Sequence, residues 1–305
     1  MSLLQAIIFD VDGTLADNER DGHRIAFNQT FSAAGLDWIW SERDYGKLVE
    51  IGGGKERIRH YMATRDMTIR DIAMRGKTES QSKSKETLEE ILKEQEQADL
   101  RVKISDRFGD PARTEELELD TWVQQLHGVK MNLYQQLIAE RRIPLRPGVL
   151  RLLQECRQAG VRLAIATTSA LPSALALIET IAPDAPDWFE VIAAGDIVPA
   201  KKPSPEIYQY ALQQLQLPAS VCWAIEDSEV GARAAIAAGL PTLITVNDYT
   251  RQADFSGATL VLSDLGERDR PIQVLGGTAA GQVKDGSWVD LALLRRILWS
   301  SAAPN

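Results

Sequence analysis

Short apolar runs that alternate with helical patterns constrain the fold of this chain most. Six runs have the length and the apolar, often β-branched composition of buried strands, and they lie at 4–9, 161–167, 189–194, 221–225, 241–246 and 259–262. Helical spacing of apolar residues appears between them, at 148–159, 170–181, 204–215 and 228–238. Strands so uniformly apolar need cover on both faces. The pattern therefore predicts an α/β fold with a doubly wound, Rossmann-like parallel sheet.

The ends of these helices carry residues that typically start or stop a helix. Gly160 and Gly239 are expected stops, because glycine readily adopts the left-handed conformation that ends a helix. Ser204 and Ser228 are expected N-caps, since a serine hydroxyl can accept a hydrogen bond from the first free backbone N–H groups.

Residues 16–143 interrupt this rhythm. The interval has no strand-like run, and its apolar residues show helical spacing, as at Leu119, Trp122, Val123, Leu126, Leu133 and Leu137. We expect a core domain of residues 1–15 plus 144–305 and an inserted helical cap domain of residues 16–143. The turns at Asp12-Gly13-Thr14 and at residues 144–148 (PLRPG) suit a hinge, and 66–118 is a charged segment that we expect to be mobile.

Charge and composition exclude several classes of protein. The formal net charge of −9 argues against a nucleic-acid groove, which needs clustered Lys and Arg. The apolar start is too short to span a membrane, and Cys156 and Cys222 lie in patterns typical of buried thiols. We expect a cytoplasmic monomer whose partner is a small molecule, with neither nucleic acid nor membrane.

The first strand ends directly at a pair of acids in the string IIFDVDGTLAD. Asp10 and Asp12 would lie at the carboxyl edge of the sheet, where ligands of open α/β folds bind. A calcium loop of the EF-hand type fits poorly, because Gly13 is fourth and Leu15 sixth where that loop needs glycine sixth. Ordinary turn chemistry at Asp12-Gly13 remains an alternative for this motif alone.

Polar residues also follow three further strands. The second strand ends in Thr167, Thr168 and Ser169, each of which could equally be a helix cap. Lys202 follows the third strand and precedes a proline, which biases it out of the next helix. The fourth strand ends at Glu226-Asp227. Parallel strands bring these groups to one edge of the sheet.

Four converging carboxylates would repel one another unless positive charge intervened. A divalent metal together with Lys202 supplies that charge. Oxygen ligands with no His or Cys nearby favour Mg²⁺, and His23, His60 and His127 all fall in the insertion. Zinc and a serine-type triad are therefore poorly supported.

Together, these four groups of residues resemble the motifs of the haloacid dehalogenase superfamily, in the same order along the chain. The resemblance implies that Asp10 is the nucleophile and Asp12 the general acid and base. It implies that Thr167 and Lys202 hold the transferred phosphate.

The same resemblance implies a bound Mg²⁺, with the ligand set Asp10, Asp12, Glu226 and Asp227. In the family the metal also binds the main-chain carbonyl at the position of Asp12. A proton donor such as Asp12 favours a phosphatase over a dehalogenase, whose halide leaving group needs no proton.

Three strings in the insertion are rich in groups that suit an anionic sugar. ERDGHR (19–24) and GGGKER (52–57) carry charge, while WIW (38–40) is more typical of a cap core than of a sugar platform. An ordinary helix start is an equal alternative for GGGKER. Together with the first motif, these strings resemble the CbbY subgroup, which is related to β-phosphoglucomutase. Members of that subgroup hydrolyse xylulose 1,5-bisphosphate, which inhibits the Calvin-cycle enzyme Rubisco. The substrate-binding residues we expect are Thr168, Ser169, Glu19, His23, Arg24, Lys55 and Arg57.

Three functions compete. We expect a magnesium-dependent phosphatase that hydrolyses a sugar bisphosphate through an aspartyl phosphate, with the second phosphate held by Lys55 and Arg57. A phosphosugar mutase of the β-phosphoglucomutase type would use the same core. A sugar-phosphate-binding protein without turnover is the third possibility, and the presence of every catalytic residue argues against it.

Overall fold

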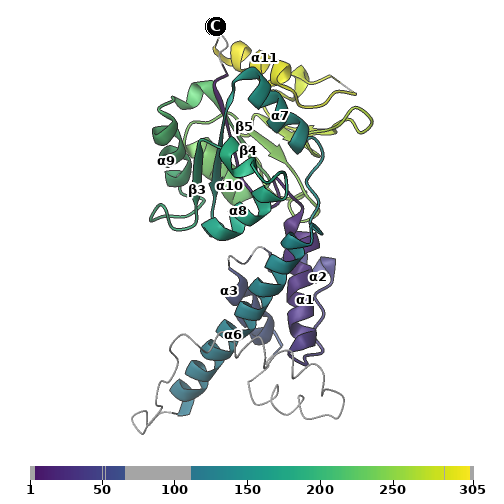
Figure 1. The fold of residues 1–305 in the computed structure, drawn as a ribbon, viewed down its shortest axis with the longest axis vertical. Coiled ribbons are helices and arrows are strands. Elements are labelled where there is room, and N and C mark those ends of the chain that lie inside the picture. Colours follow the sequence, from purple (N-terminus) through teal and green to yellow (C-terminus); the bar gives the residue numbers. More distant parts are fainter. Residues whose placement is uncertain (1–3, 50, 52, 66–110, 285, 303–305) are drawn as a thin grey trace. The chain divides into compact units, whose positions relative to one another are not determined.

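The computed structural model describes residues 4–302, apart from 50, 52, 66–110 and 285, and gives only the backbone of 111–118 and 301–302. The chain divides into two compact units (Figure 1). Met1–Glu19 and Arg141–Asn305 form the first, here called the core unit, and Arg20–Glu140 form the second, here called the inserted unit. Within the described residues, no helix combines the length and apolar character that crossing a membrane requires.

A sheet of seven strands forms the centre of the core unit, in the order β3-β2-β1-β4-β5-β6-β7. The strands span β1 Ala6–Phe9, β2 Arg162–Thr167, β3 Val191–Ala194, β4 Cys222–Glu226, β5 Thr242–Thr245, β6 Leu260–Leu262 and β7 Val274–Gly276. All neighbours pair in parallel except β6 and β7. The six expected strands are confirmed. β7 was missed because its three residues are partly exposed and show no buried pattern.

Helices cover both faces of this sheet, because alternate strand residues point to opposite sides. One face presents small residues such as Ala164 and Ala224 to α9 (Glu206–Leu215) and α10 (Glu229–Ala237). On the other face, the Trp223 indole donates to the Leu294 carbonyl of α11 (Leu291–Ala302) at 3.3 Å. α7 (Val149–Ala159) contacts α11, and α8 (Leu171–Glu179) contacts β3. Short 3-10 turns complete the unit at Ala185–Trp188, Ala219–Val221 and Ala280–Gln282.

The expected helix ends are confirmed in three of four cases. Gly160 ends α7 in the left-handed conformation, with φ of 66°, and Gly239 comes directly after Ala238, the C-cap of α10, with φ of 81°. The Ser228 hydroxyl accepts from the Gly231 N–H at 3.1 Å and caps α10. Ser204 was the wrong choice for α9, whose N-cap is Pro205.

The inserted unit is helical in its described residues, as expected. It contains α1 (Arg24–Ala33), α2 (Glu42–Leu48), α3 (Gly54–Ala63) and α6 (Pro111–Ala139), and a π-helical turn, Glu19–His23, leads into α1. Trp38 and Trp40 are buried and pack against Phe31, which confirms their place in a hydrophobic core. Of the expected mobile segment, residues 66–110 lie outside the described residues, and 111–118 begin helix α6.

Candidate active site

The polar residues predicted at the strand ends lie at one edge of the core sheet. Asp10 directly follows β1, Thr167 ends the neighbouring β2, and Glu226 ends β4 on the other side of β1. Lys202 lies in the loop that follows β3. The parallel register therefore gathers residues that are far apart in the sequence.

Lys202 joins two of the carboxylates in the centre of this edge. Its ammonium group lies 2.7 Å from Asp10 Oδ1 and 2.5 Å from Glu226 Oε1, and it also donates to the Ala166 carbonyl at 2.8 Å. The Tyr208 hydroxyl donates to the same Glu226 oxygen at 2.6 Å. The Lys202 side chain is only 5% exposed and that of Glu226 is fully buried. The pair is thus desolvated, and its charges interact strongly.

Burial controls the protonation of this cluster. Desolvation raises the pKa of Asp10 to about 8, although the charge of Lys202 opposes the rise. Desolvation, Asp10 and Glu226 likewise raise the pKa of Asp227 well above its ordinary value. Burial lowers the pKa of Lys202, but the two carboxylates more than offset it and raise the pKa overall. Lys202 is therefore charged at neutral pH, while the acids need additional positive charge to ionise together.

Asp227 is held by two polar side chains. The Asn247 amide donates to Oδ2 at 2.6 Å, and the Thr14 hydroxyl is 3.5 Å from Oδ1. Gly13 lies against the same carboxylate, because a Cβ there would be 2.2 Å from Asp227 Oδ2. The turn after Asp12 therefore needs glycine for close approach as well as for its φ of 80°.

Asp12 lies beside the cluster and is partly exposed. The Asn18 amide donates to one of its carboxylate oxygens and the Ser169 hydroxyl to the other. Asn18 is itself positioned by the Gly13 N–H, which donates to its side-chain oxygen at 2.9 Å. Thr167 is buried and accepts from the Ser169 N–H at 3.1 Å, whereas Thr168 is exposed.

Three of the predicted metal ligands are arranged as a cation site. Asp10, Glu226 and Asp227 each offer an oxygen within 4.8 Å of the others. The donors are buried carboxylates without His or Cys, which suits a hard divalent cation. Their raised pKa values also fit, because a cation would supply the positive charge that the buried acids need. The residues present are therefore able to hold a divalent metal.

Four further polar residues complete the site, and none of them was predicted from the sequence. They are Arg146, Asn247, Tyr208 and Asn18. Arg146 is 6% exposed and donates to the carbonyls of Gly13 and Thr245, among others. In the sequence it falls within the PLRPG string that was interpreted only as a hinge. Tyr208 carried a usable signal, because a tyrosine on the buried face of a helix needs a partner for its hydroxyl.

The predicted substrate-binding residues outside the core edge lie mostly in the inserted unit. His23 Nδ1 is 2.7 Å from the ammonium of buried Lys130, and the Arg24 guanidinium is 3.5 Å from Glu42. Glu19 starts the π-helical turn and belongs to the core unit.

Two further predicted residues begin helix α3. Lys55 is half-buried in its first turn, after Gly53 as N-cap. Arg57 donates to the Ile51 carbonyl at 3.0 Å and to the Tyr45 hydroxyl at 2.7 Å, so its guanidinium stabilises the preceding loop. Gly52, the first residue of GGGKER, lies outside the described residues.

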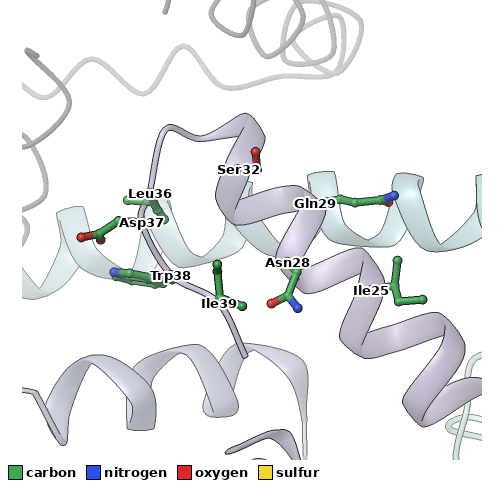
Figure 2. Close-up of a pocket in the computed structure, with 8 residues that line it drawn as sticks. All are labelled: Ile25, Asn28, Gln29, Ser32, Leu36, Asp37, Trp38 and Ile39. Atoms are coloured by element: carbon green, nitrogen blue, oxygen red, sulfur yellow. The ribbon is translucent and has the colours of Figure 1, made fainter. Parts of the chain in front are cut away.

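A separate hollow of about 570 Å³ lies in the inserted unit, beside α1 and the loop that follows it (Figure 2). One of its polar residues, Asn28, is already bonded to the backbone of Trp40, accepting at 2.8 Å and donating at 3.0 Å. The hollow contains none of the predicted site residues, and it is lined by Ile25, Asn28, Gln29, Ser32, Leu36, Asp37, Trp38 and Ile39.

Known proteins resemble this chain over most of its length. Residues 4–239 match the haloacid dehalogenase-like hydrolase family. Protein CbbY of Rhodobacter capsulatus is 40% identical over 86% of this chain and 94% of its own. A crystal structure of a CbbY mutant from Rhodobacter sphaeroides in complex with xylulose-(1,5)bisphosphate is 36% identical, with a TM-score of 0.61 over 91% of this chain and 98% of that one.

β-Phosphoglucomutase from Clostridium difficile shares the fold, with a TM-score of 0.56 and 17% identity over 98% of each chain. The doubly wound fold and the family resemblance expected from the sequence are thus confirmed. The chain belongs to the haloacid dehalogenase-like hydrolase family, within which it is an enzyme of the CbbY-like phosphatase type.

Proposed function

We propose that this enzyme is a magnesium-dependent phosphatase that hydrolyses a sugar bisphosphate through an aspartyl phosphate, with xylulose 1,5-bisphosphate as the best candidate. The observation that carries the proposal is the buried cluster of Asp10, Lys202, Glu226 and Asp227 at the sheet edge. The similarity to a CbbY structure that contains this bisphosphate supports the choice of substrate.

Asp10 is the nucleophile in this proposal. Lys202 holds its Oδ1, which leaves Oδ2 to attack phosphorus in line with the leaving sugar oxygen. A carboxylate nucleophile divides one difficult displacement into two easier ones. Bound Mg²⁺ would supply positive charge that keeps the neighbouring acids ionised and neutralises the phosphoryl oxygens.

Asp12 moves the proton in both steps. As the phosphorus–oxygen bond to the sugar breaks, Asp12 protonates the leaving oxygen. The resulting carboxylate then takes a proton from water, whose oxygen attacks the aspartyl phosphate and releases inorganic phosphate and Asp10. Hydrogen bonds from Asn18 and Ser169 fix the positions of the two Asp12 carboxylate oxygens. Such acid–base assistance typically contributes about 10²–10⁴-fold.

Thr167, Thr168 and Ser169 would hold the transferred phosphate together with Lys202. We propose that residues 16–143 act as a cap that supplies Glu19, His23, Arg24, Lys55 and Arg57. The second phosphate is the ligand we assign to Lys55 and Arg57, because both follow a glycine-rich helix start whose N–H groups favour anions.

Phosphate release from a panel of sugar monophosphates and bisphosphates, with and without EDTA, tests the proposal. We expect the highest kcat/KM for a pentulose bisphosphate and loss of activity in EDTA that added Mg²⁺ restores. Isomerised sugar phosphate from glucose 1-phosphate, without phosphate release, would instead identify a mutase. Undiminished hydrolysis in EDTA would overturn the proposed metal dependence.

A further inference from the structure

Arg146 occupies an unusual position for an arginine, since it is 6% exposed and buried in the core unit. Its two terminal nitrogens donate to four backbone carbonyls. The acceptors are Gly13, Thr245 at 3.0 Å, Val246 at 2.5 Å and Ser263 at 3.0 Å. One guanidinium thereby joins the turn after Asp12 to the ends of β5 and β6.

Two of these segments contact Asp227 from different sides. Gly13 approaches the Asp227 carboxylate so closely that a Cβ there would be 2.2 Å from Oδ2. Val246 directly precedes Asn247, whose amide donates to Oδ2 at 2.6 Å. Arg146 holds the carbonyls of Gly13 and Val246, so a shift of either one would move a group that contacts Asp227.

The Asn247 amide has a fixed orientation at this contact. Its side-chain oxygen accepts from the N–H groups of Tyr249 at 2.9 Å and Thr250 at 3.1 Å. The amide nitrogen is thus directed to Asp227. The amide can reach Asp227 only if the Asn247 backbone stays in place. Arg146 holds the carbonyls of the two preceding residues, Thr245 and Val246.

Arginine chemistry suits this task better than lysine chemistry. A guanidinium presents five donors in a rigid plane, while an ammonium is a single point with three donors. The four carbonyls around Arg146 need four donors spread over two nitrogens, more than a single ammonium can provide. The positive charge of Arg146 also acts on Asp227, whose pKa it lowers against the effect of burial.

We propose that Arg146 is a positioning residue of the metal site, whose guanidinium holds the Gly13 turn and the Thr245–Val246 backbone where Asp10, Glu226 and Asp227 together bind a divalent cation. The inference rests on the proposed function for the identity of the cation. It assigns Arg146 no contact with substrate. Loss of such supporting groups typically lowers metal affinity by about 10–100-fold.

Calorimetric titration of metal-free protein with MgCl₂, in the absence of substrate, tests the inference. Arg146→Lys keeps the charge but not the planar donor set, and we expect its Mg²⁺ dissociation constant to rise about 10-fold or more. A second readout is the rise in Tm that Mg²⁺ produces, which should shrink as affinity falls.

Arg151→Lys is the matched control. Arg151 also holds core-unit carbonyls, those of Val289 at 2.8 Å, Gly266 at 2.8 Å and Leu265 at 3.1 Å, but none beside Asp227. We expect Arg151→Lys to lower Tm in EDTA without changing Mg²⁺ affinity. Ethylguanidinium at millimolar concentration should restore Mg²⁺ affinity to Arg146→Ala and not to Arg146→Lys, whose side chain fills the space.

Unchanged Mg²⁺ affinity in Arg146→Lys would overturn the inference, as would an equal loss of affinity in Arg151→Lys. Because the titration contains no substrate, it separates this inference from the proposed function. A wild-type protein that binds Mg²⁺ but releases no phosphate would contradict the function alone. If the protein releases phosphate but its Mg²⁺ affinity is the same in wild type and Arg146→Lys, the inference alone is contradicted.

Discussion

The core edge and the inserted unit use charged residues in different ways. At the core edge, Lys202 binds Asp10 and Glu226 across sequence separations of 192 and 24 residues, and all three are almost fully buried. In the inserted unit, Arg57 bonds to groups within 12 residues and remains partly exposed. The core charges are fixed by the whole sheet, whereas the charge of Arg57 is fixed by a neighbouring loop.

This difference affects how well each group of charged residues tolerates substitution. Buried, mutually dependent charges cannot be changed singly without a large loss, since each would leave a partner unpaired in a medium of low dielectric. Partly exposed groups on a local helix start can change with smaller effects. We therefore expect reaction chemistry to be set at the core edge and substrate choice in the inserted unit.

Asp10→Asn should give the largest effect on activity. The amide cannot form the acyl phosphate, so phosphate release should fall by at least about 10⁴-fold. Steady-state assays under saturating Mg²⁺ measure this. The variant should remain folded in EDTA, because it removes one of the acids that repel each other there. Activity within tenfold of wild type would contradict the nucleophilic role.

Lys202→Met should give the largest effect on stability. It leaves Asp10 and Glu226 buried without their cation, which typically costs about 3–5 kcal/mol. Denaturant unfolding at pH 7 in EDTA measures the loss. Lys201→Met is the matched control, because Lys201 is exposed and pairs with exposed Asp196 at 2.9 Å. Equal stability of the two variants would show that the buried pair is unimportant.

Lys55→Met tests the selectivity assigned to the inserted unit. We expect KM for a sugar bisphosphate to rise about tenfold with little change in kcat, because the lost contact is made equally in the ground and transition states. Sugar monophosphates should be hydrolysed as before. Lys47→Met, at an exposed position at the end of α2, is the control. A similar KM increase for both substrate classes would contradict the assignment to the second phosphate.

His127 should give a smaller, pH-dependent effect. Desolvation, with Lys130 and Lys55, lowers its pKa in the folded protein to about 4 from an ordinary value of 6.5. The unfolded chain therefore takes up the proton first, and stability is lost as pH falls from about 6.5 towards 4. We expect His127→Gln to remove on the order of 1 kcal/mol of this loss, given partial exposure.

Parallel unfolding curves of wild type and His127→Gln across this pH range measure the difference. Both proteins should have the same pH dependence above pH 7, where His127 is neutral in the folded and unfolded states. Identical curves at pH 4.5 would contradict the lowered pKa.

The strand ends explain why so much of the core site was predictable. Each of Asp10, Thr167 and Glu226 follows or ends an apolar run, and parallel pairing then places them side by side. Arg146 could not be predicted in the same way. Its acceptors are backbone carbonyls 99 to 133 residues distant, and a carbonyl leaves no trace in the residue type. Asn247 was missed for a related reason, since Asx turns are common after strands.

The ends of the insertion are joined to each other within the core unit. The Asp17 N–H donates to the Pro144 carbonyl at 3.3 Å and the Arg146 N–H to the Leu15 carbonyl at 2.9 Å. The chain between these bonded ends is therefore a closed loop that starts and ends in the core unit. The entropic cost of closing such a loop grows only with the logarithm of its length. Evolution can consequently lengthen, shorten or exchange the intervening sequence at little thermodynamic expense, so one reaction centre can be offered many different substrates.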